Sequence, residues 1–488
     1  MKYRLISQIL GIGLIIFSFF QLLPVLVAFL YQEDSVVSFT YAFLINLFSG
    51  LFLVGVNFKR DYEDLRIRDG FLLTVLLWFT YSIFASLPFV IGESSNLTIV
   101  NAYFEAVSGL TTTGASIITE LDTQLKSVLF YRALLQWLGG LGIIVLALAL
   151  FPLLGVGGMQ LYRGETQGSV SGTKLRPKMA ETGKSLWVVY LILTVSCCFS
   201  YFFSGMGFFD AVTHSFTTVA IGGFSNYNQS FAYFNNDFLY FFGSIFMFLS
   251  ALSFSLHFLA LKKKKLNGYF LDPELKFFAS VAFLSFIFVF ISLILFSNSN
   301  DLSLLMKSLF QTISFLTTTG FTSEDHSSMP SYLPYFLIGL AGMGACAGST
   351  GGGIKAIRIL IFVKQGVKEL KKLVHPNSVL PLKVGSKIIN QEIKDSVWGF
   401  LAVYMITLLL GTMLLLASGL SFETSFSAVF SCINNLGPAL GEATFNYDSL
   451  NQISKLFLSF AMILGRLEIY TLLVPVSYTH LRAHETDI

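Results

Sequence analysis

The chain has 488 residues, of which 54% are hydrophobic and only 12% are charged, and its formal net charge is +3. Adding the 40 glycines brings the apolar share to about 62%, whereas soluble domains have roughly 45–50%. Such composition excludes a soluble globular protein, and so small a net charge indicates no nucleic-acid partner. We therefore predict an integral membrane protein with lipid as its solvent.

Ten apolar stretches are long enough to cross the hydrocarbon core, which takes about 20 residues. In chain order they cover about 7–30, 37–57, 71–91, 127–151, 185–205, 238–261, 275–297, 332–363, 397–418 and 453–475. Shorter segments lie between them at about 101–116, 209–225, 303–322 and 422–441. These are too short or polar to span and too apolar for ordinary loops, so we interpret them as re-entrant. The predicted fold class is an all-α polytopic membrane protein with ten transmembrane helices.

Lysine and arginine residues lie mainly on one side of this predicted topology. They gather in the loops at 59–68, 163–184, 262–265 and 364–394. The opposite loops carry mainly Lys126, Lys307 and Lys455. By the positive-inside rule we expect the four basic loops, and both termini, in the cytoplasm.

One unit of span, re-entrant segment and span recurs four times after an N-terminal two-helix hairpin at residues 1–60. The units cover 61–155, 156–265, 266–366 and 367–475. The re-entrant segments end in Gly114, Gly223, Gly320 and Gly437, which lie 109, 97 and 117 residues apart. Internal repeats of this kind are common in transport proteins. We predict four pseudo-repeated helix–pore loop–helix units around one pore.

The re-entrant segments have the residue types of an ion filter. Backbone carbonyls can replace the hydration shell of an ion, and glycine adopts the positive φ that turns them toward an axis. Threonine hydroxyls either add ligands or hold the loop, and the preceding helix directs one dipole end at the pore, with its sign left open. The predicted K⁺ site is formed by filter carbonyls of Thr111, Thr112, Thr113, Gly114, Ala220, Ile221, Gly222, Gly223, Thr317, Thr318, Thr319, Gly320, Asn434, Asn435, Leu436 and Gly437. The alternative, glycines that pack helices closely, accounts poorly for four motifs in one register.

These motifs resemble those of the Trk/Ktr/HKT superfamily of potassium transporters. The resemblance rests on Thr111-Thr-Thr-Gly114, Ala220-Ile-Gly-Gly223-Phe-Ser, Thr317-Thr-Thr-Gly320-Phe, Asn434-Asn-Leu-Gly-Pro438, Arg163-Gly-Glu165, the glycine-rich run Gly351 to Arg358, and Gly465-Arg-Leu-Glu-Ile-Tyr470. The two additional N-terminal spans are similar to the Trk branch rather than the shorter Ktr type. Sodium-preferring relatives carry serine at the first filter position, so Gly114 favours potassium.

The resemblance implies potassium uptake across the bacterial cytoplasmic (inner) membrane by a homodimer with one pore in each protomer. It also implies gating by a cytosolic nucleotide-binding subunit of the TrkA kind, for which residues 163–184 and 364–395 are the docking candidates. Nucleotide, either NAD or ATP/ADP, would be bound only by that partner. No covalent cofactor is expected in this chain, and K⁺ is the permeant ion.

Seven glycines occur between Gly339 and Gly353. Each costs about 1 kcal/mol against alanine in a helix, so we predict a broken helix here. The resemblance makes it an intramembrane loop that obstructs the pore, with gate residues Gly344, Gly348, Gly351, Gly352 and Gly353. The alternative, a continuous helix with a glycine packing face, requires a regular spacing that this run lacks.

Arg466 lies in the apolar stretch 457–474, where an ionisable side chain is costly and usually faces a cavity or a partner. The resemblance places it near the ion path below the filter. Lys355 and Arg358 are candidates for the same pore-electrostatic role, or for snorkelling to the inner interface. The polar tail at 476–488 departs from the family pattern, and we exclude it from the functional prediction.

A proton- or sodium-coupled cation symporter is the alternative function. Coupling of this kind predicts carboxylates at mid-membrane depth, and the predicted spans contain few. A membrane enzyme would need a metal motif, a nucleophile elbow or a phosphate loop, and none occurs on the spans, so we predict no enzymatic activity.

Overall fold

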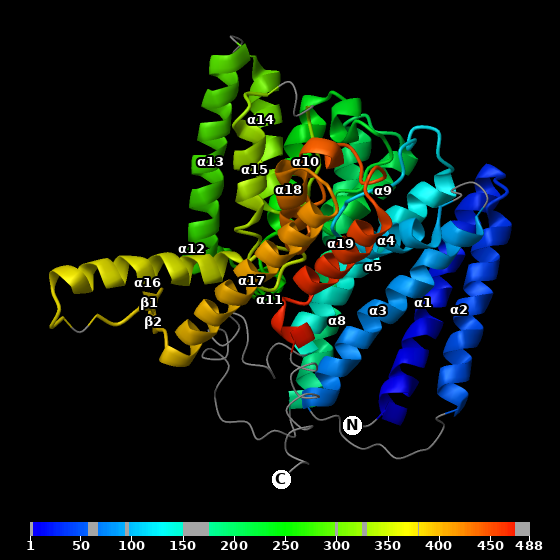
Figure 1. The fold of residues 1–488 in the computed structure, drawn as a ribbon, viewed down its shortest axis with the longest axis horizontal. Helices are drawn as coiled ribbons and strands as arrows, with labels where there is room; N and C mark the ends of the chain where they lie inside the picture. Colours follow the sequence, from blue (N-terminus) through cyan, green and yellow to red (C-terminus); the bar gives the residue numbers. More distant parts are fainter. Residues whose placement is uncertain are drawn as a thin grey trace.

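Helices dominate the computed structural model, which describes residues 3–56, 67–92, 97–149, 175–297, 301–324, 329–378 and 380–473 (Figure 1). The N-terminal hairpin consists of α1 (Tyr3–Tyr31) and α2 (Val36–Val56). A Cβ added at Gly11 or Gly50 would lie within 3 Å of the other's carbonyl oxygen, so only glycine lets these backbones approach so closely. The predicted tail at 476–488 and the first part of the docking candidate, 163–174, lie outside the described residues.

Four groups of helices follow the hairpin. The first comprises α3 (Ile67–Ile91), α4 (Ile99–Leu110) and α5 (Lys126–Ala149). The second comprises α8 (Leu175–Phe203), α9 (Phe208–Val219), the 3₁₀ turn η2 (Ser230–Tyr233), α10 (Asp237–Ser250) and α11 (Phe254–Lys263). The third comprises α12 (Asn267–Leu271), α13 (Pro273–Ser297), α14 (Leu302–Leu316), α15 (Leu333–Ala341) and α16 (Ala356–Val374). The fourth comprises the antiparallel pair β1 (Lys383–Val384) and β2 (Lys387–Ile388), α17 (Gln391–Ala417), α18 (Phe422–Asn434), η4 (Gly441–Ala443) and α19 (Gln452–Arg466).

Six described helices are long and apolar enough to span a membrane: α1, α2, α3, α8, α13 and α17. The stretch predicted as one span at 238–261 is instead divided into α10 and α11, which meet at 92°. The stretch at 332–363 is divided between α15 and α16, and α19 ends at Arg466, well before residue 475. The protein is a predominantly helical multi-span protein, and the count of ten spans stays a prediction.

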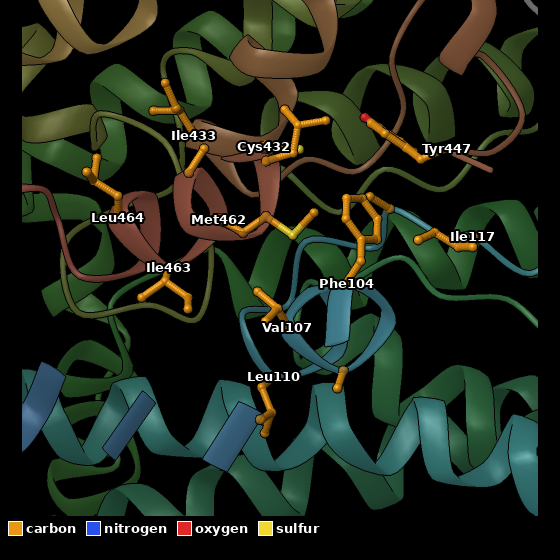
Figure 2. Close-up of a cluster of buried hydrophobic side chains, with 14 of the residues drawn as sticks. Phe104, Val107, Leu110, Ile117, Cys432, Ile433, Tyr447, Met462, Ile463 and Leu464 are labelled. Carbon is orange, nitrogen blue, oxygen red and sulfur yellow. The ribbon is translucent and has the colours of Figure 1, made fainter. Parts of the chain in front are cut away.

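The first and fourth groups share a core around α4, α18 and α19 (Figure 2). Phe104 and Val107 on α4 are fully buried, as are Cys432 on α18 and Met462 on α19. Lipid is as apolar as these side chains, so close packing rather than escape from water holds the helices together. This packing brings the first and fourth groups of helices into contact.

Candidate ion pathway

The four short helices α4, α9, α14 and α18 end in one hydrogen-bonding motif. At each end, one amide bonds to the carbonyl three residues earlier and the next amide bonds to the carbonyl five residues earlier, as in a Schellman motif. The paired donors are Thr112 and Thr113, Ile221 and Gly222, Thr318 and Thr319, and Asn435 and Leu436. Every predicted filter segment therefore begins directly at a helix C-terminus.

The first donor of each pair adopts a left-handed conformation. Thr112, Ile221, Thr318 and Asn435 have φ of 53°, 55°, 66° and 53°. Glycine is the usual residue at this point, and left-handed β-branched residues are outliers that cost of order 1–3 kcal/mol each. The left-handed conformation recurs at one register in four segments, and in three of them a β-branched residue adopts it, so it indicates a functional constraint on the backbone rather than a local accident.

The glycines that end the segments bring them into a closed ring. All four have positive φ, between 77° and 102°. A Cβ at Gly114 would overlap the carbonyl oxygen of Gly222, one at Gly223 that of Thr319, one at Gly320 that of Leu436, and one at Gly437 that of Thr113. Each segment thus contacts the next in chain order, and the fourth contacts the first. No side chain fits at any of the four positions.

A cavity of about 540 Å³ opens on one side of this ring. It is lined by all four glycines, Gly114, Gly223, Gly320 and Gly437, and by residues of the loops that follow them. A cavity of this size is large enough to hold a hydrated ion next to the ring.

The direction of the short helices decides the sign that the sequence leaves open. Their C-termini adjoin the ring, and a helix C-terminus carries about half a negative charge. Four such ends meet at one place and favour a cation there. The electrostatics of the ring therefore fit a positively charged permeant ion.

Most threonine hydroxyls of the predicted filter segments hydrogen-bond within their own segment. Oγ1 of Thr111 lies 2.7 Å from Oγ1 of Thr113, and Oγ1 of Thr317 lies 2.8 Å from Oγ1 of Thr319. The first hydroxyl of each pair also donates to the helix, to a carbonyl four residues earlier. The Thr112 hydroxyl differs, since it is buried with no partner among the described residues.

Side chains outside the predicted segments hold the second and fourth filters. Gln136 on α5 donates from Nε2 to the carbonyl of Gly222 at 2.7 Å and accepts the Phe224 amide at 3.1 Å. Tyr447 donates its hydroxyl to the carbonyl of Gly437 at 2.8 Å. The sequence prediction missed both residues, because neither lies in a repeated motif.

The loop between α15 and α16, residues 342–355, lies directly against the predicted filter segments. The Gly352 amide donates to Thr318 Oγ1 at 2.8 Å, and the Gly353 amide donates to the carbonyl of Asn434 at 3.1 Å. Thr350 donates its hydroxyl to the carbonyl of Val219 at 3.1 Å. The loop therefore contacts the second, third and fourth groups where their filter segments begin, on the side of the ring away from the cavity.

The same loop explains the bend between α10 and α11. The Cys346 amide donates to the carbonyl of Ala251 at 2.9 Å, and the Phe254 amide donates to the carbonyl of Gly348 at 3.1 Å. A segment that takes over helical hydrogen bonds is a known cause of a sharp kink. The stretch predicted as a span at 238–261 is therefore a bent pair of helices rather than one straight helix.

Arg466 is the last residue of α19 rather than a mid-helix residue, because Glu468 and Ile469 have positive φ and end the span. Its buried guanidinium donates to the carbonyl of Thr350 at 2.7 Å and to that of Gly139 at 3.2 Å. A positive charge is favoured at a helix C-terminus. The two hydrogen bonds join the loop 342–355 to α5.

Lys355 and Arg358 are both buried, which contradicts the snorkelling alternative. Lys355 donates from Nζ to the carbonyl of Gly351, and Arg358 pairs with Glu468. Lys355 therefore holds the loop 342–355, and Arg358 holds the turn after α19. Each stays a candidate for pore electrostatics.

Glu274, near the start of α13, is a third residue that the sequence prediction missed. Its Oε1 accepts the Ala347 amide at 2.7 Å and the Ile357 amide at 3.2 Å, and the residue is 5% exposed. One carboxylate oxygen thus holds both the middle of the loop and the first turn of α16. An acidic residue at the edge of an apolar span was the available signal.

Comparison with known proteins places the chain in a family. The TrkH family model, described as cation transport protein, matches residues 39–483. The chain belongs to this family. It is 43% identical over 484 residues to the Trk system potassium uptake protein TrkH of Salmonella typhimurium, covering 99% of this chain and 100% of the relative. It is 37% identical over 479 residues to the Trk system potassium uptake protein TrkG of Escherichia coli K12, covering 97% and 98%.

The fold of this TrkH-family chain also matches a solved structure. The crystal structure of the potassium transporter TrkH from Vibrio parahaemolyticus matches with a TM-score of 0.90 at 41% identity, covering 97% of this chain and 98% of that one. The family resemblance stated from the sequence motifs is confirmed. Relatives of this family are named as transporters, not as enzymes.

Proposed function

We propose that this chain takes up potassium across the bacterial cytoplasmic membrane through the ring of four glycine-ended segments. The closed ring carries the proposal, because four backbone segments in one register surround one point and four negative helix ends meet there. The relatives that are named as potassium uptake proteins support the choice of ion. Gly114 supports potassium over sodium, because sodium-preferring members of the superfamily that the motifs resemble carry serine at this position.

The loop 342–355 is the proposed gate. It lies against the filter entrances of three groups, opposite the outer cavity, and Arg466 adds a positive charge beside it. An ion leaving the ring on this side meets the loop and a cation. Conduction therefore requires the loop to move away from Thr318 and Asn434.

Flux in proteoliposomes tests the proposal. Purified protein is reconstituted with an outward or inward K⁺ gradient, and the flux is compared with that under an equal Na⁺ gradient. We expect K⁺ flux to exceed Na⁺ flux by about tenfold or more, a difference of about 1.4 kcal/mol. Equal K⁺ and Na⁺ fluxes would contradict the proposal.

Proton movement in the same vesicles distinguishes channel-like conduction from the symporter alternative. Coupling needs a carboxylate free to exchange protons. Among the described residues, the buried Glu105 and the partly exposed Glu468 pair with arginines, and the buried Glu274 accepts two amides. We therefore expect no acidification that tracks K⁺ entry; a fixed ratio of H⁺ to K⁺ would establish symport.

The proposed assembly is a homodimer with a cytosolic nucleotide-binding partner of the TrkA kind. By the positive-inside rule we expect residues 364–395 in the cytoplasm. The end of α16 and the β1–β2 pair extend away from the bundle (Figure 1). The chain mass is 54.1 kDa. Light scattering of the purified protein should give twice this protein mass, and a monomer would contradict the dimer.

Removing the Glu274 side chain should loosen the gate. We expect Glu274→Ala to raise partner-free K⁺ flux by about threefold to tenfold, because two loop amides lose their acceptor and each lost buried bond costs about 1–3 kcal/mol. Glu274→Gln keeps one acceptor oxygen and should leave the flux closer to wild type. If K⁺ flux through the alanine variant is no higher than through wild type, Glu274 does not hold the proposed gate closed.

A further inference from the structure

A side chain on each short helix, about nine residues before the filter glycine, holds the stretch of chain that follows that glycine. Nine residues before the filter glycines stand Glu105, His214, Gln311 and Ala428, and the first three are buried polar residues. Hydrogen bonds join Glu105 Oε2 to the amide of Ile117 (2.8 Å), His214 Nε2 to the hydroxyl of Ser225 (3.0 Å) and Gln311 Oε1 to the amide of Ser323 (2.9 Å). These partners lie two or three residues after each filter glycine.

The fourth group replaces this contact with a neighbouring one. Ala428 has no polar side chain, but the adjacent Ser427 Oγ accepts the amide of Leu440 at 2.9 Å. Leu440 lies three residues after Gly437. In all four groups, a side chain of the short helix therefore hydrogen-bonds to the chain just after its own filter glycine. Of these four side chains, only Glu105 in the first group is an acidic one.

The charge in the first group belongs to a buried ion pair. Arg132 on α5 donates from Nε to Oε1 of Glu105 at 2.7 Å, and their side chains are 2% and 0% exposed. A buried pair stabilises only when its remaining groups are also hydrogen-bonded. Here the guanidinium donates further to Ser116 Oγ and to the carbonyl of Ser225, both at 3.0 Å.

These two further bonds reach matching places on neighbouring filters. Ser116 follows Gly114 by two residues, and Ser225 follows Gly223 by two residues. One planar guanidinium thus spans the outgoing ends of the first and second segments, and Arg132 also lines the outer cavity. Arginine suits this task because its donors form a rigid fork.

We propose that Glu105 and Arg132 are positioning residues that hold the first and second filter segments at a fixed separation and so contribute to ion selection. The inference rests on the proposed potassium function. A carbonyl ring distinguishes ions by the number and placement of its oxygens. The buried pair contacts no ion; it acts through the backbone on either side of Gly114 and Gly223.

The test measures K⁺ and Na⁺ flux for Glu105→Gln, Arg132→Gln and the double variant beside wild type. We expect each single variant to lower the K⁺/Na⁺ flux ratio by about threefold or more, because it leaves an unpaired buried group at the filter. The double variant should lose no more than the worse single variant, since both substitutions remove one shared interaction.

Asn46→Ala is the matched control. Asn46 donates to Gln21 at 2.7 Å between α1 and α2, so this substitution also removes a buried hydrogen bond, but away from the filter. We expect lower thermal stability and an unchanged K⁺/Na⁺ ratio. A ratio that falls equally in this control would show that the Glu105 effect is general loosening, and would overturn the inference.

The remaining outcomes separate the two proposals. A wild-type protein without K⁺ preference overturns the proposed function and this inference together. A selective wild type whose preference is unchanged in both single variants overturns this inference alone. Should the single variants fail to fold, the double variant, which buries no charge, is judged by the same threefold criterion.

Discussion

Gly114→Ser should lower the K⁺/Na⁺ flux ratio by about tenfold or more, which corresponds to about 1.4 kcal/mol. Gly114 has φ of 84°, where a residue with a side chain is strained by roughly 1–2 kcal/mol. Its Cβ would also overlap the carbonyl oxygen of Gly222. Because that oxygen belongs to the neighbouring segment, relief of the overlap must displace a carbonyl of the proposed ring. Flux of both ions in proteoliposomes measures the effect.

Gly339→Ser is the matched control for this substitution. Gly339 lies in α15, and a Cβ there has no atom within 4 Å. We expect this variant to retain the wild-type ratio, with at most a small loss of flux. A Gly114→Ser protein with undiminished K⁺/Na⁺ discrimination would remove Gly114 from the filter.

Deleting Gly344 to Gly353 should raise K⁺ flux without the cytosolic partner by about tenfold or more, since removal of about 1.4 kcal/mol from a closed state shifts its population tenfold. The structure makes this deletion feasible because the two ends of the segment lie together. The Ile354 amide donates to the carbonyl of Gly342 at 3.2 Å, so Met343 can be joined to Ile354 with a short backbone adjustment.

Two further variants make the deletion interpretable. Thr318→Val removes the acceptor for the Gly352 amide and should raise the flux less than the deletion does. Deleting Gly385 and Ser386 removes the two-residue turn between β1 and β2, which lies outside the pathway, and should leave partner-free flux unchanged. A folded loop-deletion protein that conducts no more than wild type counts against the gate.

Local sequence patterns were enough to predict that the four short segments end in a constrained backbone closed by glycine. Thr-Thr-Thr-Gly in two groups marks a helix end, a left-handed residue and a glycine that has no space for a side chain, so one motif reports three structural constraints. The glycine-rich run likewise indicated a helix break, and residues 342–355 are non-helical. Both features depend on residues that are close in the chain.

Contacts between residues far apart in the chain could not be predicted from the sequence alone. The bend before Phe254 depends on bonds to Cys346 and Gly348, about a hundred residues later. The end of α19 at Arg466 was also missed, because the apolar composition continues past it. Hydropathy measures whether a segment suits lipid, and it carries no information on which backbone groups already have partners.

Arg132 shows a signal that was present but unused. It is an ionisable residue inside the apolar stretch 127–151, the same feature that identified Arg466. Glu105, in the preceding re-entrant segment, is its natural counter-ion. Pairing these two charges from the sequence would have predicted the buried ion pair next to the first predicted filter segment.

The most direct test of the central claim is to locate the ion. Crystals grown or soaked with Rb⁺, a heavier analogue of K⁺, give anomalous difference density at its binding sites. The four-segment ring predicts peaks on its axis, inside the ring that Gly114, Gly223, Gly320 and Gly437 close. Ordered Rb⁺ elsewhere along the chain, with none inside the ring, would contradict the account.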